Sequence, residues 1–315
     1  MSDLKVASLF AGIGGICLGF RQAGFEVVWA NERDHKACNT YRKNWKDTSL
    51  VEEDISKIDP HTIPDFDVLV AGFPCQPFST AGKQRGFSDP RGNLFFEIAR
   101  IADIKKPSVI FLENVANLQE HDKGRTFLTI YNTLVELGYV IRYRIMTSMR
   151  HGNIPQLRNR IFIVAFLDEG ACQRFVYPEE IPLERTIHDI VHSNIQQHEI
   201  YYCNAEIQQE FASQIIDQDS IYQMTDWGLR KNRNHVCPTL TAFMGMRKGR
   251  VPMVRDDFGI RYLTLRECLD FQGFPETFKF PNTIQIQDAY KQIGNSVTVP
   301  VIRRIAENLF TVMQQ

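Results

Sequence analysis

Short apolar runs alternate with amphipathic helical patterns through the first 170 residues of this 315-residue chain. Six runs have the length and composition of buried strands: Lys5–Phe10, Val27–Asn31, Asp67–Ala71, Ser108–Leu112, Val140–Met146 and Ile161–Phe166. Between them, the apolar spacing predicts helices over Gly15–Ala23, His35–Asn44, Leu94–Ile104 and Gly124–Leu137. Strands that alternate with helices form a mainly parallel, twisted sheet with helices on both faces. We therefore predict an α/β fold whose ligand site lies at the carboxyl ends of the strands.

The charge pattern changes after about residue 178. Residues 179–219 contain nine acidic side chains and one basic side chain, whereas residues 230–250 contain six basic side chains and no acidic one. This asymmetry predicts a second, smaller domain over residues 179–262 with one cationic face. Residues 1–178 would form the catalytic domain. Residues 263–315, with a closing helix over Thr298–Met313, would return to that domain.

Composition excludes several classes of protein. Hydrophobic residues make up 43% of the chain and charged residues 23%, as in ordinary globular proteins, so disorder is excluded. No apolar run approaches the roughly 20 residues of a membrane span, and the first ten residues do not resemble a secretory signal.

The seven cysteines are scattered without a Cys-x-x-Cys pair, which indicates free thiols in a reducing cytoplasm and no metal site. The net charge of −1 does not indicate a polyanion binder, although a chain with this net charge can still carry local patches of positive charge.

A glycine-rich turn follows the first predicted strand. Phe10-Ala11-Gly12-Ile13-Gly14-Gly15 would let the backbone approach a ligand at the start of a helix. Glu32 ends the next strand, where a carboxylate can accept hydrogen bonds from ribose hydroxyls, and Asp54 is expected at the same edge. These residues favour adenosine binding over a turn without a ligand, and the glycine spacing differs from the dinucleotide fingerprint.

Cys75 stands in the rigid turn Gly72-Phe73-Pro74-Cys75-Gln76-Pro77, directly after a predicted strand. The two prolines fix the direction of the thiol, which suits a nucleophile, and the alternative is a buried structural cysteine. The following residues, 80–92, combine glycines with cations and predict a mobile loop that closes over a polyanion.

Two further motifs occur at strand ends. Glu113-Asn114-Val115 follows the fourth predicted strand, so that its carboxyl would lie at the same edge as Cys75 and could donate to a ring nitrogen if protonated. Gln156-Leu157-Arg158-Asn159-Arg160 enters the sixth strand, where arginines two apart would share one face. The alternatives are that Glu113 faces solvent and that Arg158 and Arg160 are ordinary surface arginines.

In this order, the motifs resemble those of the DNA (cytosine-5)-methyltransferases of bacterial restriction–modification systems. Phe10–Gly15 resembles the methyl-donor loop, Pro74-Cys75-Gln76 the nucleophile motif, Glu113-Asn114-Val115 the acid motif and Gln156–Arg160 the arginine motif. Two later segments, Arg261–Cys268 and Gln292–Val297, resemble the element after the target-recognition region and the C-terminal motif of the donor site. The resemblance extends along nearly the whole chain.

The resemblance implies an S-adenosylmethionine site in a Rossmann-like methyltransferase core. Phe10 and Ile55 would flank the adenine, Glu32 would hold the ribose, and Asp54 would hold the exocyclic amine. The remaining residues of the donor site would be Gly12, Gly14, Gly15, Pro74, Leu94, Asn295 and Ser296. Arg33 departs from the family pattern, since close relatives often have a tryptophan there, but a guanidinium can also stack on adenine.

The resemblance also implies the chemistry. The Cys75 thiolate would attack C6 of cytosine, Glu113 would hydrogen-bond N3 and the 4-amino group, and Arg160 would bind O2. Arg158 would orient Glu113. The target base would have to leave the duplex, as it does in other methyltransferases that act on bases.

The same resemblance implies duplex DNA as the substrate, a monomeric enzyme without membrane contact, and a cognate restriction endonuclease that acts on the same site. Residues 238–242, with Thr239-Leu240, resemble the Thr-Leu element of the target-recognition region. The predicted DNA contacts are Lys83, Arg85, Arg230, Arg233, Thr239, Arg247, Lys248 and Arg250. Three rivals remain at this point: a tRNA cytosine methyltransferase, a non-catalytic DNA-binding regulator and an NAD-dependent oxidoreductase.

Overall fold

The computed structural model describes residues 4–73, 94–232, 235–246 and 250–315. By compactness the chain divides into two units. The first, which we call the core unit, consists of Met1–Met146, Asn159–Glu179 and Val301–Gln315, and the second unit consists of Thr147–Arg158 and Glu180–Pro300. The chain therefore leaves the core unit twice and returns to it twice. The functional boundaries expected at residues 178 and 262 stay a prediction.

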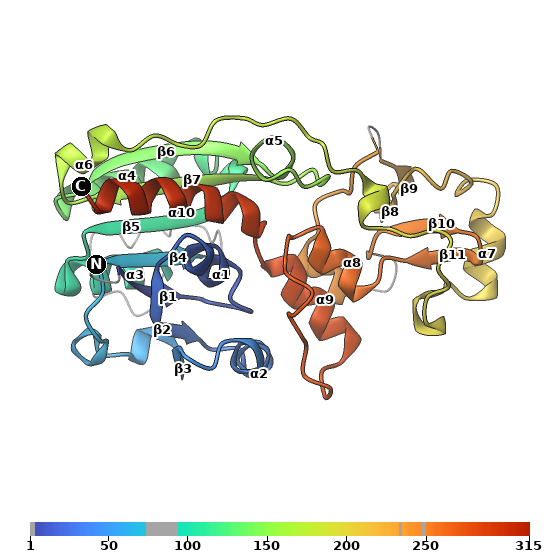
Figure 1. Cartoon of the computed structure of the whole chain (residues 1–315), viewed down its shortest axis with the longest axis horizontal. Helices are drawn as coiled ribbons and strands as arrows, with labels where there is room; N and C mark the ends of the chain where they lie inside the picture. Colours follow the sequence, from blue (N-terminus) through green and yellow to red (C-terminus); the bar gives the residue numbers. More distant parts are fainter. Residues whose placement is uncertain (1–3, 74–93, 233–234, 247–249) are drawn as a thin grey trace. The chain divides into compact units, whose positions relative to one another are not determined.

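The core unit contains a seven-stranded sheet in the order β3-β2-β1-β4-β5-β7-β6 (Figure 1). Its strands are β1 (Lys5–Leu9), β2 (Glu26–Glu32), β3 (Ser49–Glu52), β4 (Val68–Gly72), β5 (Val109–Val115), β6 (Val140–Thr147) and β7 (Asn159–Phe166). All pairs from β3 to β5 are parallel, whereas β5 and β7 are antiparallel. The strand order reverses between β1 and β4, and ligands of such sheets bind at the carboxyl ends beside this reversal.

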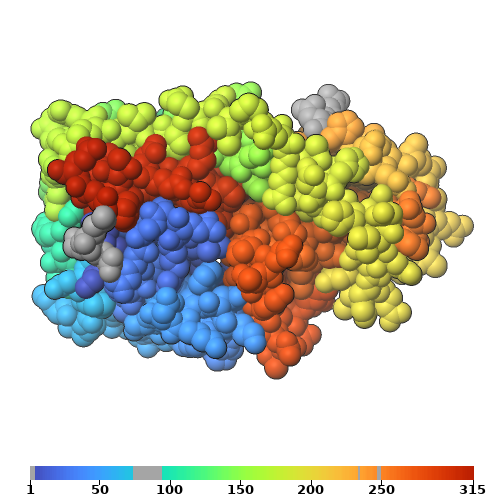
Figure 2. Space-filling model, in the orientation of Figure 1, coloured from blue at the N-terminus to red at the C-terminus, as the bar shows by residue number. Residues whose placement is uncertain are grey.

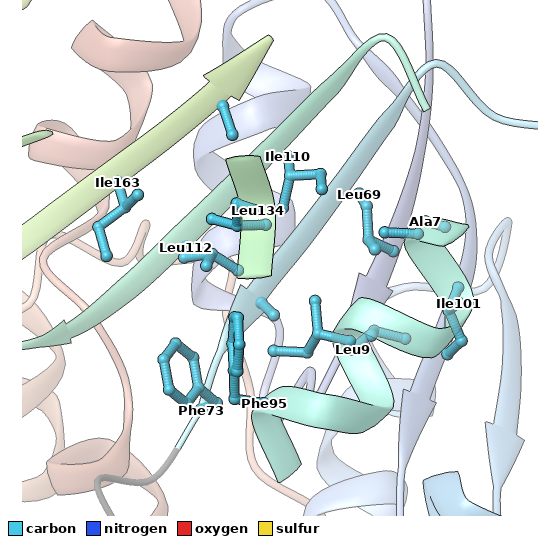
Figure 3. Close-up of a cluster of buried hydrophobic side chains, with 14 of the residues drawn as sticks. Ala7, Leu9, Leu69, Phe73, Phe95, Ile101, Ile110, Leu112, Leu134 and Ile163 are labelled. Carbon is cyan, nitrogen blue, oxygen red and sulfur yellow. The ribbon is translucent and has the colours of Figure 1, made fainter. Parts of the chain in front are cut away.

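Helices pack on both faces of this sheet. They are α1 (Gly15–Gln22), α2 (His35–Asn44), α3 (Leu94–Lys105), α4 (Arg125–Glu136), α6 (Glu169–Arg174) and α10 (Val299–Met313), together with the short 3-10 turns η1 (Ile55–Lys57), η2 (Pro60–Thr62) and η5 (Ala116–Gln119). On one face, Ile101 of α3 and Leu134 of α4 join Leu69, Ile110 and Leu9 of the strands in one buried cluster (Figure 3). The parallel strands are covered on both sides, which explains why they appear in the sequence as continuous apolar runs.

The opposite face of the sheet carries α1 and α10. The ring of Phe20 in α1 lies 5.2 Å from that of Phe111 in β5, and Phe25 lies 5.1 Å from Phe310 of α10. Gly19 of α1 has no room for a side chain, because an added Cβ would lie 2.5 Å from Ile302 of α10. Figure 2 shows α10 in red at the surface, beside the blue N-terminal segments that it covers.

The second unit is built around a four-stranded sheet in the order β11-β10-β8-β9. Its strands are β8 (Tyr222–Thr225), β9 (Gly228–Lys231), β10 (Met253–Asp256) and β11 (Gly259–Tyr262), and every neighbouring pair is antiparallel. Its helices are α5 (Ser148–Gly152), α7 (Ala205–Phe211), α8 (Leu265–Asp270) and α9 (Ile286–Asn295), with the 3-10 turns η6 (Ile187–Asp189), η7 (Glu199–Tyr201) and η8 (Ala242–Gly245). Phe211 of α7 packs on this sheet with Ile215, Tyr222, Met253 and Ile260.

A fully buried arginine links two elements of the second unit. Arg261 of β11 is 0% exposed; its Nε lies 2.7 Å from Asp256 Oδ2 and its Nη2 lies 2.8 Å from Glu267 Oε1. Burial opposes the charge of Arg261, but the hydrogen bonds and negative charges of Glu267 and Asp256 outweigh it and raise the pKa of the guanidinium. Glu267 also forms a capping box with Thr264 at the start of α8. The resulting network ties β10 and β11 to α8.

The predicted α/β class is confirmed, and so are the six predicted strands and the five predicted helices, to within a few residues at their ends. β3 and the whole second sheet were not expected from the sequence. Within the described residues, no helix is long and apolar enough to cross a membrane. The same part of the chain holds no group of three or more His, Cys, Asp or Glu side chains that could bind a metal ion.

Candidate active site

The turn after β1 has a strained backbone and open space beside it. Phe10 has a φ of +52°, and Gly12 and Gly14 have φ values of +56° and +87°. Apart from Gly12 itself and its two chain neighbours, no heavy atom of the described residues lies within 4 Å of the position that a Cβ on Gly12 would occupy. Gly14 is needed for the opposite reason, since a Cβ there would lie 2.2 Å from Trp45 Nε1. Gly15 begins α1 directly behind this turn.

The Glu32 carboxylate is held in one orientation by backbone N–H groups. Gly12 N donates to Oε2 at 2.9 Å, and the N–H groups of Arg33 and Asp34 donate to Oε1 at 2.8 Å each. A carboxylate can accept about four hydrogen bonds. The three that are present fix the turn after β1 to the end of β2 and still leave acceptor capacity for a hydroxyl group.

The next predicted donor residues follow β3. Asp54 caps η1 by accepting from the N–H and the hydroxyl of Ser56, and Arg33 Nη1 lies 3.3 Å from Asp54 Oδ2. The hydrogen bonds from Ser56 lower the pKa of Asp54 and Arg33 lowers it further, although burial acts in the opposite direction. Ile55 is only 2% exposed and belongs to the core cluster, against which Phe10 and Leu94 also pack. Arg33 itself is exposed, with its guanidinium directed to Asp54.

Glu113 lies at the carboxyl ends of β4 and β5, where it is 8% exposed. It pairs with Gly72 in the parallel register, and a Cβ on Gly72 would lie 3.4 Å from Glu113 Oε2. Arg160 Nε lies 2.9 Å from Glu113 Oε1, in a charged contact that is not an aligned hydrogen bond. The antiparallel register explains this contact, because Arg160 faces Val115 and is therefore a diagonal neighbour of Glu113. A buried carboxyl beside a cation at this edge can hydrogen-bond a polar ring.

Asn114 was not assigned a role from the sequence. Its Nδ2 donates to Phe73 O at 2.8 Å, and both residues are buried. Phe73 is the last described residue after β4, so Asn114 anchors the point at which the chain enters residues 74–93. Cys75, Pro74, Lys83 and Arg85 fall in that stretch and lie outside the described residues.

Arg158 does not lie on the same strand as Arg160, contrary to our expectation. β7 begins at Asn159, and Arg158 belongs to the second unit. Its buried guanidinium donates to Leu240 O at 2.7 Å and to Ser296 O. The predicted placement of Arg158 and Arg160 on one strand was wrong because the chain passes from the second unit to the core unit between Arg158 and Asn159.

The Thr-Leu element is held by the residues just before Arg158. Thr239 donates its hydroxyl to Leu157 O, and Leu240 N donates to Gln156 Oε1 at 3.1 Å. Gln156 is fully buried, and its Nε2 also donates to Phe271 O at 2.6 Å. These contacts make residues 155–158 an anchor of the second unit, a role that no spacing in the sequence indicated. Asn295, which ends α9, and Ser296 belong to the same unit.

The predicted DNA-contacting cations differ in their surroundings. Arg230 is exposed on β9 and has no ion-pair partner among the described residues. Arg250 pairs with Asp226 in the turn between β8 and β9. Arg233, Arg247 and Lys248 lie outside the described residues.

The cysteines that the structure describes are free and buried: Cys17, Cys38, Cys172, Cys203, Cys237 and Cys268. Burial raises the pKa of Cys38 to about 12 and that of Cys203 to about 11, and it also raises the pKa of Cys17, Cys237 and Cys268. The thiolate is the reactive form of cysteine, so these five side chains are poor nucleophiles.

The fold is a Rossmann-like α/β core, and polar side chains, among them Glu32 and Glu113, lie at the carboxyl ends of its strands. A family model for C-5 cytosine-specific DNA methylases matches residues 4–311. The chain therefore belongs to this family and is a DNA (cytosine-5)-methyltransferase of the bacterial restriction–modification type.

Two bacterial relatives align with nearly the whole chain. It is 47% identical to the Type II methyltransferase M.Bsp6I of Bacillus sp. (strain RFL6), with 98% of this chain and 99% of the relative aligned. It is 36% identical to the Type II methyltransferase M.HhaI of Haemophilus parahaemolyticus, with 98% of this chain and 95% of the relative aligned. A crystal structure of a DNMT2 mutant from Spodoptera frugiperda shares the fold, with a TM-score of 0.75 at 19% identity over 98% of this chain and 100% of the other. The predicted family and enzyme class are thus confirmed, and the oxidoreductase and the non-catalytic regulator are not supported.

Proposed function

We propose that this enzyme transfers a methyl group from S-adenosylmethionine to C5 of a flipped-out cytosine in one short sequence of duplex DNA. The reaction would proceed through a covalent bond between Cys75 and C6 of the base. One observation carries this proposal: the buried carboxyl of Glu113, paired with the partly buried Arg160, lies beside Gly72, where Asn114 anchors Phe73 two residues before Cys75 in the sequence.

The residues after β1 and β2 fit the methyl donor. The free acceptor capacity of Glu32 suits the ribose hydroxyls, and the open side of Gly12 leaves room for a close backbone contact. Phe10 provides an apolar face for adenine, with Asp54 as the acceptor for its amine. Leu94, Ile55, Gly14, Gly15 and Pro74 would line the remainder, and the family resemblance adds Asn295 and Ser296. S-adenosylmethionine, when bound, would supply the methyl group.

The chemistry of the base requires the other residues. Cytosine C5 is a weak nucleophile, and addition of the Cys75 thiolate to C6 makes it enamine-like. Glu113 would hydrogen-bond N3 and the 4-amino group and so favour the electron shift, while Arg160, which lies 2.9 Å from the Glu113 carboxyl, would bind O2. After methyl transfer, loss of the C5 proton and of the Cys75 thiolate restores the ring. A stacked base cannot reach these groups, which is why flipping is required.

The second unit would select the sequence and keep the enzyme on duplex DNA. Arg230 and the cations near residue 248 suit phosphate contacts. We further propose that the enzyme acts as a monomer and protects the sequence that a partner endonuclease cleaves.

The test uses Cys75→Ala and duplex DNA amplified by PCR, which carries no methyl groups. Wild-type protein should transfer label from methyl-labelled S-adenosylmethionine to this DNA, and bisulfite sequencing should locate the modified cytosine. Cys75→Ala should lose transfer but retain DNA binding. A duplex with 5-fluorocytosine at the target, which blocks loss of the C5 substituent, should form a denaturant-resistant adduct with wild-type protein alone.

Cys172→Ala is the matched control, because it removes a buried thiol on α6 and should retain transfer and adduct formation. Substantial turnover by Cys75→Ala would contradict the covalent mechanism. Transfer to unfractionated tRNA in place of DNA would favour the RNA-modifying rival.

A further inference from the structure

The turn between β8 and β9 exposes a tryptophan that has no structural role in the second unit. Trp227 is 98% exposed, more than any other large hydrophobic residue in the described part of the chain. An indole is among the largest apolar side chains, and complete exposure of one to water is unfavourable. Such a residue at a hairpin tip indicates a contact that forms with a partner.

Hydrogen bonds brace the backbone of the turn that carries Trp227. The Thr225 hydroxyl donates to Gly228 O at 2.8 Å, and Trp227 N donates to Thr225 Oγ1 at 3.2 Å. Gly228 has a φ of +107°, which permits the chain to enter β9 after two turn residues. Arg250 pairs with Asp226, so the acidic residue next to Trp227 is neutralised. The indole is therefore presented by a braced turn without net negative charge.

The other hairpin of the same sheet provides a comparison. β10 and β11 are joined by Asp257-Phe258, again followed by a glycine with positive φ, and Phe258 is 49% exposed. Asp257 accepts a hydrogen bond from the neutral Gln218 amide. Because β8 and β10 are antiparallel, the two turns lie at opposite ends of the sheet. Two turns of the same layout thus differ in charge, and only one of them suits a polyanion.

The strand that follows Trp227 supports DNA as the partner. Arg230 is exposed on β9, opposite Gln223 of β8, and has no ion-pair partner among the described residues. Met224 and Leu229 point to the other face and pack on the core of the unit. A two-stranded ribbon fits the major groove of DNA, where side chains reach the edges of bases.

We propose that the β8–β9 hairpin is a DNA-contacting ribbon, in which Trp227 packs its indole against a base of the recognition sequence and Arg230 contacts a phosphate. Trp227 is then a specificity-determining residue, and Arg250 positions it through Asp226. This inference rests on the proposed function, since it assigns a role in the choice of DNA sequence.

The experiment compares Trp227→Ala and Trp227→Phe with Phe258→Ala, the matched exposed aromatic at the other turn. The probe is PCR-amplified, unmethylated duplex DNA. Trp227→Ala should weaken DNA binding by about 5- to 150-fold, the range for loss of one specific base contact in duplex DNA. Its salt dependence should not change, because no charge is removed, whereas Arg230→Gln should lower the salt slope by about one. Trp227→Phe should lose less DNA affinity than Trp227→Ala, and Phe258→Ala should bind DNA as tightly as wild-type protein.

Two further measurements report on Trp227 directly. DNA should quench the fluorescence of wild-type protein, and the quenched component should be missing from Trp227→Phe, which retains only Trp29 and Trp45. Bisulfite sequencing should show a broader set of methylated sequences for Trp227→Ala than for wild type.

Unchanged affinity, unchanged quenching and an unchanged methylated sequence for Trp227→Ala would overturn the proposal. Equal losses in Trp227→Ala and Phe258→Ala would overturn it as well, because the effect would not be specific to this turn. If wild-type protein binds DNA without methylating it, the proposed function fails, and binding and fluorescence still decide the role of the hairpin.

Discussion

Substitution of Arg261 by Met should destabilise the second unit by about 5 kcal/mol. Removing one partner of a buried ion pair costs roughly 3–5 kcal/mol, because the remaining charge stays buried and unpaired. Arg261 serves two carboxylates, Asp256 and Glu267, and its side chain is 0% exposed. We therefore expect the upper end of that range. Methionine fills a similar volume, so the loss would reflect charge rather than a cavity.

Hydrogen exchange gives a second measurement on this variant. Without the guanidinium, the two carboxyls stay buried but lose their countercharge. Calorimetric unfolding measures the loss of stability, and faster hydrogen exchange of the β10 and β11 amides should locate it.

Arg303→Ala serves as the control, since its ion pair with Glu307 is a surface pair with side chains 53% and 40% exposed. Such a pair contributes at most about 0.5 kcal/mol. A loss below about 1 kcal/mol in Arg261→Met, or unchanged hydrogen exchange of the β10 and β11 amides, would refute the assignment of Arg261 as the charge that holds this network together.

Two further predictions concern other carboxylates. Glu32→Ala should weaken S-adenosylmethionine binding by roughly 1.5–3 kcal/mol, as expected for loss of a charge-assisted hydrogen bond. Glu32→Gln should lose less binding free energy. Unchanged affinity in titration calorimetry would remove Glu32 from the donor site. Asp217, whose pKa is lowered to about 2 chiefly by the hydrogen bond from Lys231, should stabilise the fold above the unfolded pKa of about 4 and lose this contribution as pH falls through 2. Asp217→Asn should accordingly lower the free energy of unfolding by about 1 kcal/mol at pH 7, after allowance for solvent screening, and by roughly half of that at pH 3. Urea unfolding at the two pH values measures this difference. Equal losses at pH 7 and pH 3 would contradict the role of Asp217.

The sequence predicted the core unit well for a physical reason. Strands such as β4 are buried on both faces, so they appear as continuous apolar runs with helical patterns between them. β3 has four residues at the edge of the sheet and only partial burial, and it carries no such signal. The strands of the second unit are equally short, and their pairing depends on tight turns rather than on long apolar segments.

The candidate site was predictable as a set of strand-end residues but not as a set of contacts. Parallel topology implies that Glu32 and Glu113 lie at the same edge. The Glu113–Arg160 contact, in contrast, depends on the antiparallel insertion of β7 beside β5, and no local spacing encodes that register. The anchoring of Phe73 by Asn114 is likewise a long-range contact.

The placement of α10 affects how the protein is made. α10 covers the α1 face of the sheet, yet Glu180–Pro300 precede most of it in the sequence and are synthesised before it. At roughly 5–20 residues per second, the ribosome completes β7 on the order of ten seconds before α10 emerges. During that interval the apolar surface around Phe25 has no cover. The growing polypeptide should therefore be a client for chaperones at this stage, and enzyme activity should follow synthesis of α10 rather than synthesis of the sheet.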